Sequence, residues 1–281
     1  MAQDTVFYQK IERIFDRNTG PLIMGILNIT PDSFFDGGKY TTEHAWIERT
    51  REMIAAGAEI IDVGAYSSRP GAKDISEEEE SARLIPAILS IRKEFPEILI
   101  SVDTFRAAVA EKAVKVGANI INDISGGTLD EQMFPIVAKL KVPYVLMHIQ
   151  GTPQTMQINP QYKNVVEEVF SFFVEKIQEL KKAGVEKVIS DPGFGFGKNV
   201  EHNFLLLKSL EKFNELNCPV LAGLSRKSMV NKLLNISSKD SLNGTSVLNM
   251  IALQNGAKIL RVHDVKEAME VVRIYEYLKK I

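Results

Sequence analysis

The chain is poor in the features that mark secreted, membrane and nucleic-acid-binding proteins. Cys218 is its only cysteine, so no disulfide can form within the chain, and a reducing cytoplasm is the expected setting. No apolar run is long enough to span a bilayer, and the N-terminus lacks a basic-then-apolar leader pattern. The formal net charge is −2, which provides no global field to attract nucleic acid or an anionic membrane. Any anionic ligand would therefore need a local cluster of cations.

What the 281 residues do contain is a regular alternation of short apolar runs and amphipathic segments. Strands that are apolar on both faces and joined by helices predict a parallel sheet. We expect strands at 22–27, 59–63, 98–102, 119–121, 143–147, 188–191, 219–224 and 257–260. Eight such units predict a single α/β fold, a (β/α)8 (TIM) barrel over residues 21–281, after a lead-in segment at 1–20. A doubly wound open sheet is the alternative, but no GxGxxG motif follows the first strand.

Alternating glycine and phenylalanine residues follow the sixth predicted strand, between Asp191 and Lys198. Pro192 disfavours continued strand pairing, and the glycines permit backbone angles that are closed to other residues. Asp191 is therefore expected at a strand end, facing a mobile aromatic loop. A carboxylate beside aromatic rings suits a flat heterocycle that offers N–H groups. The alternative is a flexible turn in which Asp191 only caps the next helix.

Polar residues recur at the carboxyl ends of the predicted strands, and nothing comparable stands at the amino ends. In barrels of this kind the active site lies at the carboxyl ends. Helix capping competes as an explanation for any one of these residues, but it does not account for the whole ring. For His148, a structural hydrogen bond is as plausible as a functional role. The ring consists of Asn28, Asp62, Asp103, Asn122, His148, Asp191, Lys227, Arg261 and His263.

The ring divides by chemistry into two sets. The first set can form hydrogen bonds with the donor-rich edge of a heterocycle and pack against its face. It consists of Asp103, Asn122, Asp191, Lys227, Met147 and Phe196. The second set suits an anion, because Arg gives paired donors to phosphate oxygens: Asn28, Arg69, Arg261 and His263. Asn28 offers an oxygen to a hydrated Mg²⁺ that bridges phosphates. The amides of a helix starting near 225–228 could hold a small carboxylate.

These features predict a displacement reaction on a ring-shaped substrate that carries a phosphate-type leaving group, with a separate anionic co-substrate. Carboxylates would stabilise positive charge developing on the heterocycle, while Arg and His would stabilise the departing anion.

Seven motifs, in order from about residue 21 to the C-terminus, resemble the signatures of one family. They are Leu27-Asn28-Ile29-Thr30-Pro31-Asp32-Ser33-Phe34, Asp62-Val63-Gly64 with Ser68-Arg69-Pro70-Gly71, Ser101-Val102-Asp103-Thr104, Ile121-Asn122-Asp123, residues 191–198, Ser225-Arg226-Lys227-Ser228 and Arg261-Val262-His263-Asp264. The family that they resemble is dihydropteroate synthase.

This resemblance implies a cytoplasmic transferase of folate biosynthesis, a sulfonamide target. Such an enzyme joins 6-hydroxymethyl-7,8-dihydropterin diphosphate to 4-aminobenzoate, with Mg²⁺, in an SN1-like displacement. By position, the first set would hold the pterin and the second the diphosphate and its metal. Ser68, Arg69, Lys227 and Ser228 would border the 4-aminobenzoate pocket, and Asp103, Lys227, Arg261 and His263 would act in catalysis. Loops at 28–40 and 64–76 would close over both substrates.

Two departures and two rival interpretations remain open. Tyr66 stands where many members have Glu, and Ser68 where they have Thr, which bears on the contacts of the second loop. A pterin-binding methyltransferase barrel has no diphosphate to hold, so the Arg and His residues argue against it. A non-catalytic pterin-binding paralogue is the other rival, although every expected polar position is filled. The resemblance also implies a homodimer, for which Val247 and Met250 are candidate contacts.

Overall fold

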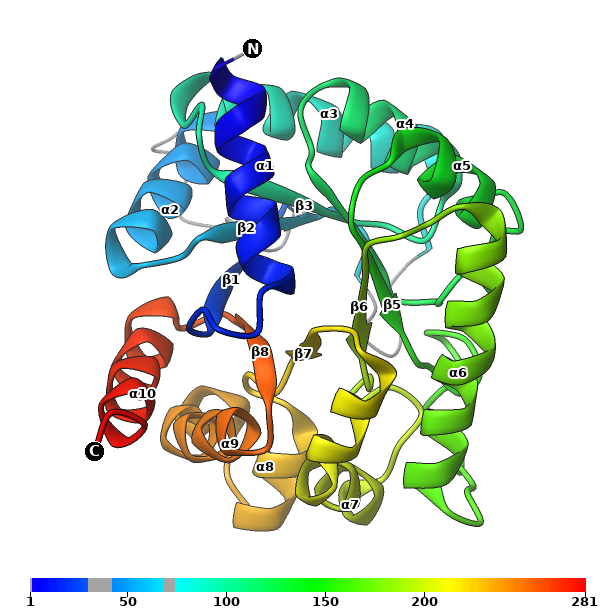
Figure 1. Cartoon of the computed structure of the whole chain (residues 1–281), viewed down its shortest axis with the longest axis vertical. Helices are drawn as coiled ribbons and strands as arrows, with labels where there is room; N and C mark the ends of the chain where they lie inside the picture. The colour runs from blue at the N-terminus through cyan, green and yellow to red at the C-terminus, as the bar shows by residue number, and fades with distance from the viewer. Residues whose placement is uncertain (1, 30–41, 68–73) are drawn as a thin grey trace.

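The computed structural model describes residues 2–29, 42–67 and 74–281. Within them, parallel strands close into a barrel in which each strand pairs with the next along the chain and β8 pairs with β1 (Figure 1). The strands are β1 (Leu22–Asn28), β2 (Ile60–Gly64), β3 (Leu99–Asp103), β4 (Ile120–Asp123), β5 (Tyr144–Met147), β6 (Val188–Asp191), β7 (Val220–Ala222) and β8 (Ala257–Val262). The predicted (β/α)8 barrel is confirmed.

Helices surround the barrel and return the chain from the end of each strand to the start of the next (Figure 1). Ser76 followed by Glu79 is a capping-box pattern that predicts a helix start at this point. The structure confirms it, because the Ser76 side chain accepts a hydrogen bond from the Glu79 amide at 3.2 Å at the start of α3. The outer helices are α2 (Thr42–Ala56), α3 (Glu77–Glu94), α4 (Ala107–Lys115), α5 (Met133–Leu140), α6 (Val165–Ala183), α7 (Val200–Lys208), α8 (Ser228–Leu234), α9 (Leu242–Gln254) and α10 (Val265–Leu278), with short 3-10 turns at Leu210–Leu216 and Ser238–Asp240.

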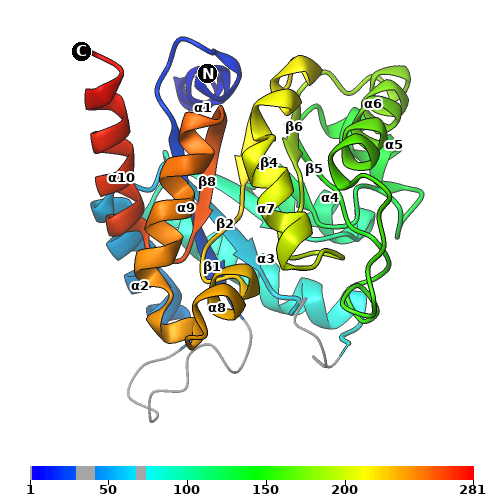
Figure 2. The same cartoon turned by 90° about the horizontal axis from the view of Figure 1, so that it is seen from below.

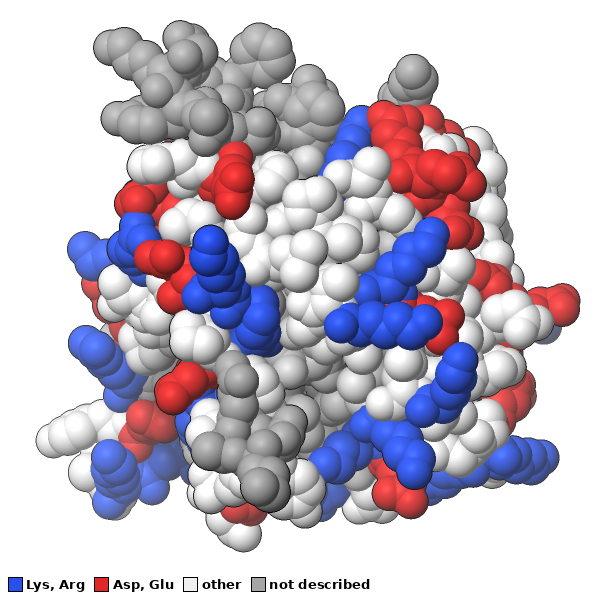
Figure 3. All heavy atoms as spheres, turned by 90° about the horizontal axis from the view of Figure 1, so that it is seen from above, with Lys and Arg blue, Asp and Glu red and all other residues white. Residues whose placement is uncertain are grey.

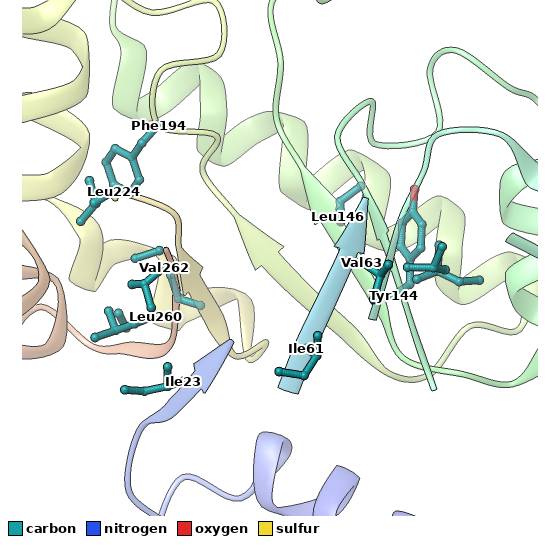
Figure 4. Close-up of a cluster of buried hydrophobic side chains, with 14 of the residues drawn as sticks. Ile23, Ile61, Val63, Tyr144, Leu146, Phe194, Leu224, Leu260 and Val262 are labelled. Carbon is teal, nitrogen blue, oxygen red and sulfur yellow. The ribbon is translucent and has the colours of Figure 1, made fainter. Parts of the chain in front are cut away.

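Alternation along each strand divides the core into two layers. Side chains such as Ile61 and Val63 of β2 point outward and pack under the helices (Figure 4). The intervening residues point into the barrel, where a second apolar cluster fills its amino end. That inner cluster consists of Leu22, Met24, Ile60, Leu99, Ile120, Val145, Ile189, Leu221 and Ile259 together with Ile14.

The lead-in segment contains a helix that the sequence analysis did not assign, α1 (Ala2–Phe15). It lies across the amino end of the barrel, opposite the end at which α8 lies (Figure 2). Ile14 is 1% exposed and belongs to the inner cluster, and Phe7, Ile11 and Phe15 pack against it. The helix therefore closes the barrel at its amino end.

Two predicted boundaries differ from the structure. The strand expected at 219–224 is only Val220–Ala222, because the ladder to β8 is irregular between Val220 and Leu221. The sequence pattern predicts a helix only over 247–254, whereas α9 starts five residues earlier, at Leu242. Gly244 explains the difference: it weakens the helical pattern, yet a Cβ there would lie 2.5 Å from Val230, so glycine permits α9 to pack closely on α8.

The surface carries charges of both signs. On the face drawn in Figure 3, Lys and Arg side chains are interspersed with Asp and Glu. Among the described helices, none combines the length and apolar character needed to cross a bilayer.

Candidate active site

A buried cluster of acids around Arg261 lies at the carboxyl end of the barrel. The Arg261 Nε donates to Asp62 Oδ2 at 2.6 Å, and its Nη2 donates to Asp103 Oδ2 at 2.6 Å. Asn122 Nδ2 donates to the same Asp62 oxygen at 3.0 Å. Register brings these groups together, because Gly64 of β2 pairs with Asp103, and Asp103 pairs with Asn122. The cluster therefore links β2, β3, β4 and β8.

Charge and burial oppose each other in this cluster. Burial raises the pKa of Asp103 to about 7, with Arg261 acting in the opposite direction. Burial alone would lower the pKa of Arg261, but the carboxylates of Asp62 and Asp103 raise it above its ordinary value. The guanidinium is therefore held as a cation, and Asp103 can change its protonation state near neutral pH.

Asp62 has a larger part in the site than the sequence predicts. It was placed in the ring of strand-end residues but given no ligand, whereas the structure makes it the acceptor for both Arg261 and Asn122. Its side chain is fully buried, and its Oδ1 has no hydrogen-bond partner among the described residues. Arg261 is consequently paired with Asp103 of the first set and with Asp62, and it does not stand apart with the other anion-binding candidates.

Asp191, Lys227 and Phe196 meet on the opposite side of the barrel mouth. Asp191 is 5% exposed, and its Oδ1 accepts from the Gly193 amide at 2.8 Å. Burial raises the pKa of Asp191, and Lys227 is the main opposing group. Lys227 Nζ lies 4.3 Å from the centre of the Phe196 ring, and desolvation lowers its pKa to about 8. Met147 is buried and pairs in register with Asp191, so all the predicted pterin contacts line one mouth.

The loop after β6 is held in place, which corrects the expectation of a mobile loop. Lys198 Nζ lies 3.0 Å from the Gly193 carbonyl oxygen and 2.9 Å from that of Phe196. Side chains from three other segments hold further backbone groups of the loop. Asn203 of α7 accepts from the Gly195 amide, while Gln157 and Tyr162 of the β5–α6 connection donate to the carbonyls of Gly195 and Gly197. Lys227, after β7, donates to the carbonyl of Phe194. The aromatic wall is therefore preorganised.

Glycine is required at Gly193 and Gly197 for two reasons. Both have positive φ angles, 69° and 63°, which other residues rarely adopt. A Cβ at Gly193 would collide with the His148 carbonyl oxygen, and one at Gly197 would approach the backbone of Gln150 within 2.5 Å. The glycines thus provide close packing rather than flexibility.

His148 has the structural hydrogen bond that was one of its two expected roles. Its Nδ1 lies 2.9 Å from Lys198 Nζ, and burial holds the pKa of His148 well below its ordinary value. The buried Nζ of Lys198 also donates to the His148 carbonyl at 3.3 Å. This pair ties the end of β5 to the loop after β6.

His263 lies beside the motif that follows β7. Its Nδ1 is 3.0 Å from Ser225 Oγ, and its carbonyl accepts from Arg49 Nη2 at 2.8 Å. Burial lowers the pKa of His263 to about 4, and the positive charge of Arg261 adds to that effect. Near pH 7 the imidazole is therefore neutral, and it can assist an anion as a hydrogen-bond donor but not as a cation.

The remaining predicted residues lie at the rim or outside the described residues. Asn28 ends β1 beside Gly64. Ser228 begins α8 and lines a cavity of about 330 Å³ together with Gln157 and Lys232. Ser68 and Arg69 fall outside the described residues, as do residues 30–40 of the first loop and 68–73 of the second.

The departure at Tyr66 has a structural explanation. The Tyr66 ring stacks edge-on against Phe105, with 5.0 Å between centroids, and its hydroxyl accepts from Gln154 Nε2 at 2.8 Å. The guanidinium of Arg106 lies 5.6 Å from the Tyr66 ring. Tyr66 therefore anchors the start of the second loop to the segments that follow β3 and β5.

Comparison with known proteins agrees with this geometry. The family model described as "Pterin binding enzyme" matches residues 24–263. A dihydropteroate synthase of Escherichia coli is 48% identical over 259 residues, which is 91% of each chain. A crystal structure of Yersinia pestis dihydropteroate synthase with a sulfonamide drug has a TM-score of 0.89 and 40% identity, covering 95% of this chain and 96% of that one. A structure of Xanthomonas albilineans dihydropteroate synthase with 4-aminobenzoic acid has a TM-score of 0.88 and 38% identity, and the match covers 93% of this chain and 94% of that one.

The chain therefore belongs to the pterin-binding enzymes. Its fold is a closed barrel of the kind whose active sites lie at the carboxyl ends of the strands. Within that class its relatives are dihydropteroate synthases, and the chain is a member of that family.

Proposed function

We propose that the chain condenses 6-hydroxymethyl-7,8-dihydropterin diphosphate with 4-aminobenzoate to give 7,8-dihydropteroate and pyrophosphate. The observation that carries this proposal is the convergence of Asp103, Asn122, Asp191 and Lys227 on one barrel mouth in a chain of this family. The activity makes the chain a transferase of folate biosynthesis. We place it in the cytoplasm, the setting that its single cysteine favours.

The pterin would lie between the two halves of the mouth. Asp103, Asn122 and Asp191 supply acceptors and an amide for its nitrogen-rich edge, while Met147 and Phe196 supply apolar contact. The held position of the Phe196 loop supports this assignment, because a preorganised wall needs little reorganisation on binding. Lys227 beside Phe196 would bind the polar rim of the pterin and face the amine that attacks it.

The diphosphate would be held by Asn28, Arg69, Arg261 and His263. A guanidinium has five N–H donors, and the two used for Asp62 and Asp103 leave three for phosphate oxygens. Arg261 would thus connect the acids that bind the pterin with the anion that leaves it. His263 would contribute as a neutral donor, in keeping with its lowered pKa.

The residues at this edge fit a Mg²⁺ ion of the kind that binds through phosphates. The described residues contain no cluster of three or more His, Cys, Asp or Glu suited to a metal, which disfavours a dedicated protein cage. Mg²⁺ commonly keeps several waters and takes one or two protein oxygens plus substrate phosphates. Asn28, half-buried at the end of β1, would supply such an oxygen. When bound, the ion would neutralise charge on the diphosphate.

The 4-aminobenzoate would lie outside the pterin. Its carboxylate would bind near Ser228 at the start of α8, with Ser68, Arg69 and Lys227 bordering the ring. The cavity beside Ser228 supports this position, because it opens between α7, α8 and the held loop. The amine would then face the methylene carbon of the pterin.

The reaction would follow an SN1-like course. The C–O bond between the pterin methylene and the diphosphate breaks, and its electron pair leaves on the diphosphate oxygen. The acids of the mouth stabilise the resulting pterin cation, and Arg261 stabilises the departing anion. The lone pair of the amine nitrogen then forms the C–N bond, and that nitrogen loses one proton.

The test is pyrophosphate release by pure protein with Mg²⁺ and the pterin diphosphate, with and without 4-aminobenzoate. Release that depends on 4-aminobenzoate and is inhibited by a sulfonamide supports the proposal. The absence of turnover together with tight pterin binding would indicate a non-catalytic paralogue. Methyl transfer from a methylated folate would indicate the methyltransferase alternative.

We also propose that the chain forms a homodimer through its last helices. Val247 on α9 is 52% exposed, whereas Met250 packs on the barrel core, so Val247 is the better candidate contact. Three apolar residues of α10 are more than half exposed as well: Ile274, Tyr277 and Leu278. Light scattering of the purified chain tests this, and Val247→Glu should shift the mass toward the monomer.

A further inference from the structure

Two consecutive residues after β7, Ser225 and Arg226, form hydrogen bonds with the residues that follow β8. Ser225 Oγ accepts from the His263 amide at 3.2 Å and lies 3.0 Å from the His263 Nδ1. Arg226 forms a two-point ion pair with Asp264, at 2.8 Å and 2.9 Å. Two segments that are far apart in the sequence therefore form one unit at the rim of the site.

The backbone of this motif bends at Arg226, so that the neighbouring side chains of Ser225 and Lys227 contact different partners. Arg226 has a φ of 54°, an uncommon value for a residue other than glycine. Its amide donates to Thr245 Oγ1 at 3.1 Å, and its Nη1 donates to the Ser238 and Lys239 carbonyls at 2.9 Å. These contacts hold the bend in place, with Ser225 on His263 and Lys227 beside Phe196.

Counting protons favours one tautomer of His263. A serine hydroxyl has one proton to donate and two lone pairs. One lone pair of Ser225 accepts the His263 amide, and among the described residues the only acceptor in reach of the hydroxyl proton is Nδ1. When Nδ1 accepts this proton, the ring's own hydrogen must be on Nε2. Nε2 has no partner among the described residues, so it is free to donate to a ligand.

The charged groups around His263 favour its neutral form. Arg261, Arg226 and Lys227 lower its pKa along with burial, while Asp264 raises it. The carboxylate of Asp264 is itself paired with Arg226, which limits its influence on the imidazole. Near neutral pH the ring therefore carries a single N–H.

We propose that Ser225 is a positioning residue that fixes His263 as the Nε2–H tautomer and so presents one neutral donor to the departing diphosphate. The inference rests on the proposed function for the identity of that anion, but the tautomer itself does not depend on it. A donor fixed before reaction needs no reorientation when negative charge develops on the leaving group.

The first experiment measures the tautomer in the wild-type chain and uses a variant only to assign the signal. The chain has four histidines, so its ¹⁵N-labelled imidazoles give a small set of signals, and the signal that His263→Asn removes identifies the residue. Long-range ¹H–¹⁵N spectra at pH 7.5 should show a protonated Nε2 and an unprotonated Nδ1. Inorganic pyrophosphate with Mg²⁺ should shift Nε2 more than Nδ1. A dominant Nδ1–H form or an imidazolium would overturn the proposal.

The second experiment removes the hydroxyl. In Ser225→Ala the His263 signal should become a mixture of tautomers, and kcat should fall about three- to tenfold, the effect of one net hydrogen bond. The KM for 4-aminobenzoate should not change, and Ser225→Thr should restore the wild-type tautomer. Ser190→Ala is the matched control, because Ser190 is also buried and donates to the Pro219 carbonyl at 3.2 Å without touching His263. A wild-type His263 spectrum in Ser225→Ala contradicts the proposal.

The two proposals can fail separately. If the wild-type chain releases no pyrophosphate but His263 is the Nε2–H tautomer and loses that preference in Ser225→Ala, the proposed function is wrong and the positioning role of Ser225 remains. If turnover is normal but the His263 tautomer does not change in Ser225→Ala, the proposed function stands and the positioning role of Ser225 is wrong.

Discussion

The two ends of the barrel are built from the same strands yet have opposite chemistry. Inward-pointing positions near the amino end are apolar, as at Ile60 and Ile259, and α1 seals them from water. Two residues further along the same strands, the inward positions are Asp62 and Arg261. Successive inward positions are about 6.6 Å apart along a strand. Two residues along a strand therefore separate an apolar core that stabilises the fold from a cluster of charges that is costly to bury.

The largest effect is expected from removing the cation of the polar end. Arg261→Met should abolish measurable turnover and destabilise the fold by about 3–5 kcal/mol, because it leaves the fully buried Asp62 and the partly buried Asp103 without their partner. Urea unfolding and pyrophosphate release measure the two losses. Adding Asp62→Asn should recover part of the stability and none of the activity. Full stability in Arg261→Met alone would show that the acids do not depend on this guanidinium.

A more selective loss is expected at Asp103. Asp103→Asn should reduce kcat/KM by about 2–4 kcal/mol of transition-state stabilisation, since it removes one charge that faces the pterin cation. Asp123→Asn is the matched control. Asp123 is buried too, but it lies on the outer face, where it accepts from the Tyr144 hydroxyl at 2.6 Å and the Ser125 amide at 2.7 Å. That control should lose stability and keep its turnover per folded molecule.

The apolar end should respond in the opposite way. Ile14→Ala should destabilise the fold by ~3 kcal/mol through lost burial and an unfilled cavity. Because α1 lies at the far end of the barrel, kcat and both KM values should not change under conditions where the variant is folded. Thermal unfolding and steady-state kinetics on one sample test this. A fall in kcat at full folding would show that the two ends are coupled.

The polar end of the barrel should also respond to pH. The pKa of Asp103, raised from 3.8 to about 7, predicts that kcat/KM falls about tenfold per pH unit below pH 7 as the carboxylate gains a proton. Stability should change in the opposite direction. Since the folded-state pKa is the higher one, protonation favours the folded state, and this group adds stability as the pH falls from 7 toward 4. In Asp103→Asn both trends should disappear.

The smallest effect is expected at Tyr66, on the rim. Tyr66→Phe keeps the stacking on Phe105 and loses the hydroxyl with its hydrogen bond from Gln154, which is worth about 1 kcal/mol or less. The KM for 4-aminobenzoate should rise less than about threefold, and pterin binding should not change. Tyr66→Ala, which also removes the ring, should have the larger effect of the two. Equal effects would mean that the ring contributes nothing.

The sequence was sufficient to predict the barrel and most residues of its mouth. A buried parallel strand has an apolar run and a sharp polar end, so Asp103, Asn122 and Asp191 could be placed by position along the chain. The partner of Arg261 could not be predicted, because it depends on the stagger of β8 against β1 and β2, which a strand pattern does not contain. The role of Ser225 could not be predicted for the same reason, because its partner His263 lies 38 residues away in the sequence.

Other misses had a signal that was present but weak. Phe7, Ile11, Ile14 and Phe15 recur at helical spacing, and that pattern could have predicted α1 within an otherwise polar segment. The loop after β6 was expected to move because glycine usually implies freedom. Its backbone partners come from Gln157, Tyr162, Asn203 and Lys227, which only the tertiary structure brings together.

The crowding around Gly193 and Gly197 has a consequence for how this site can change under selection. Neither position has space for even a methyl group, and neither backbone angle suits another residue. An inhibitor whose contacts are mostly with this main chain would bind a surface that point mutations can hardly remodel. Escape variants should therefore arise at side chains around the loop, and the glycines themselves should stay unchanged.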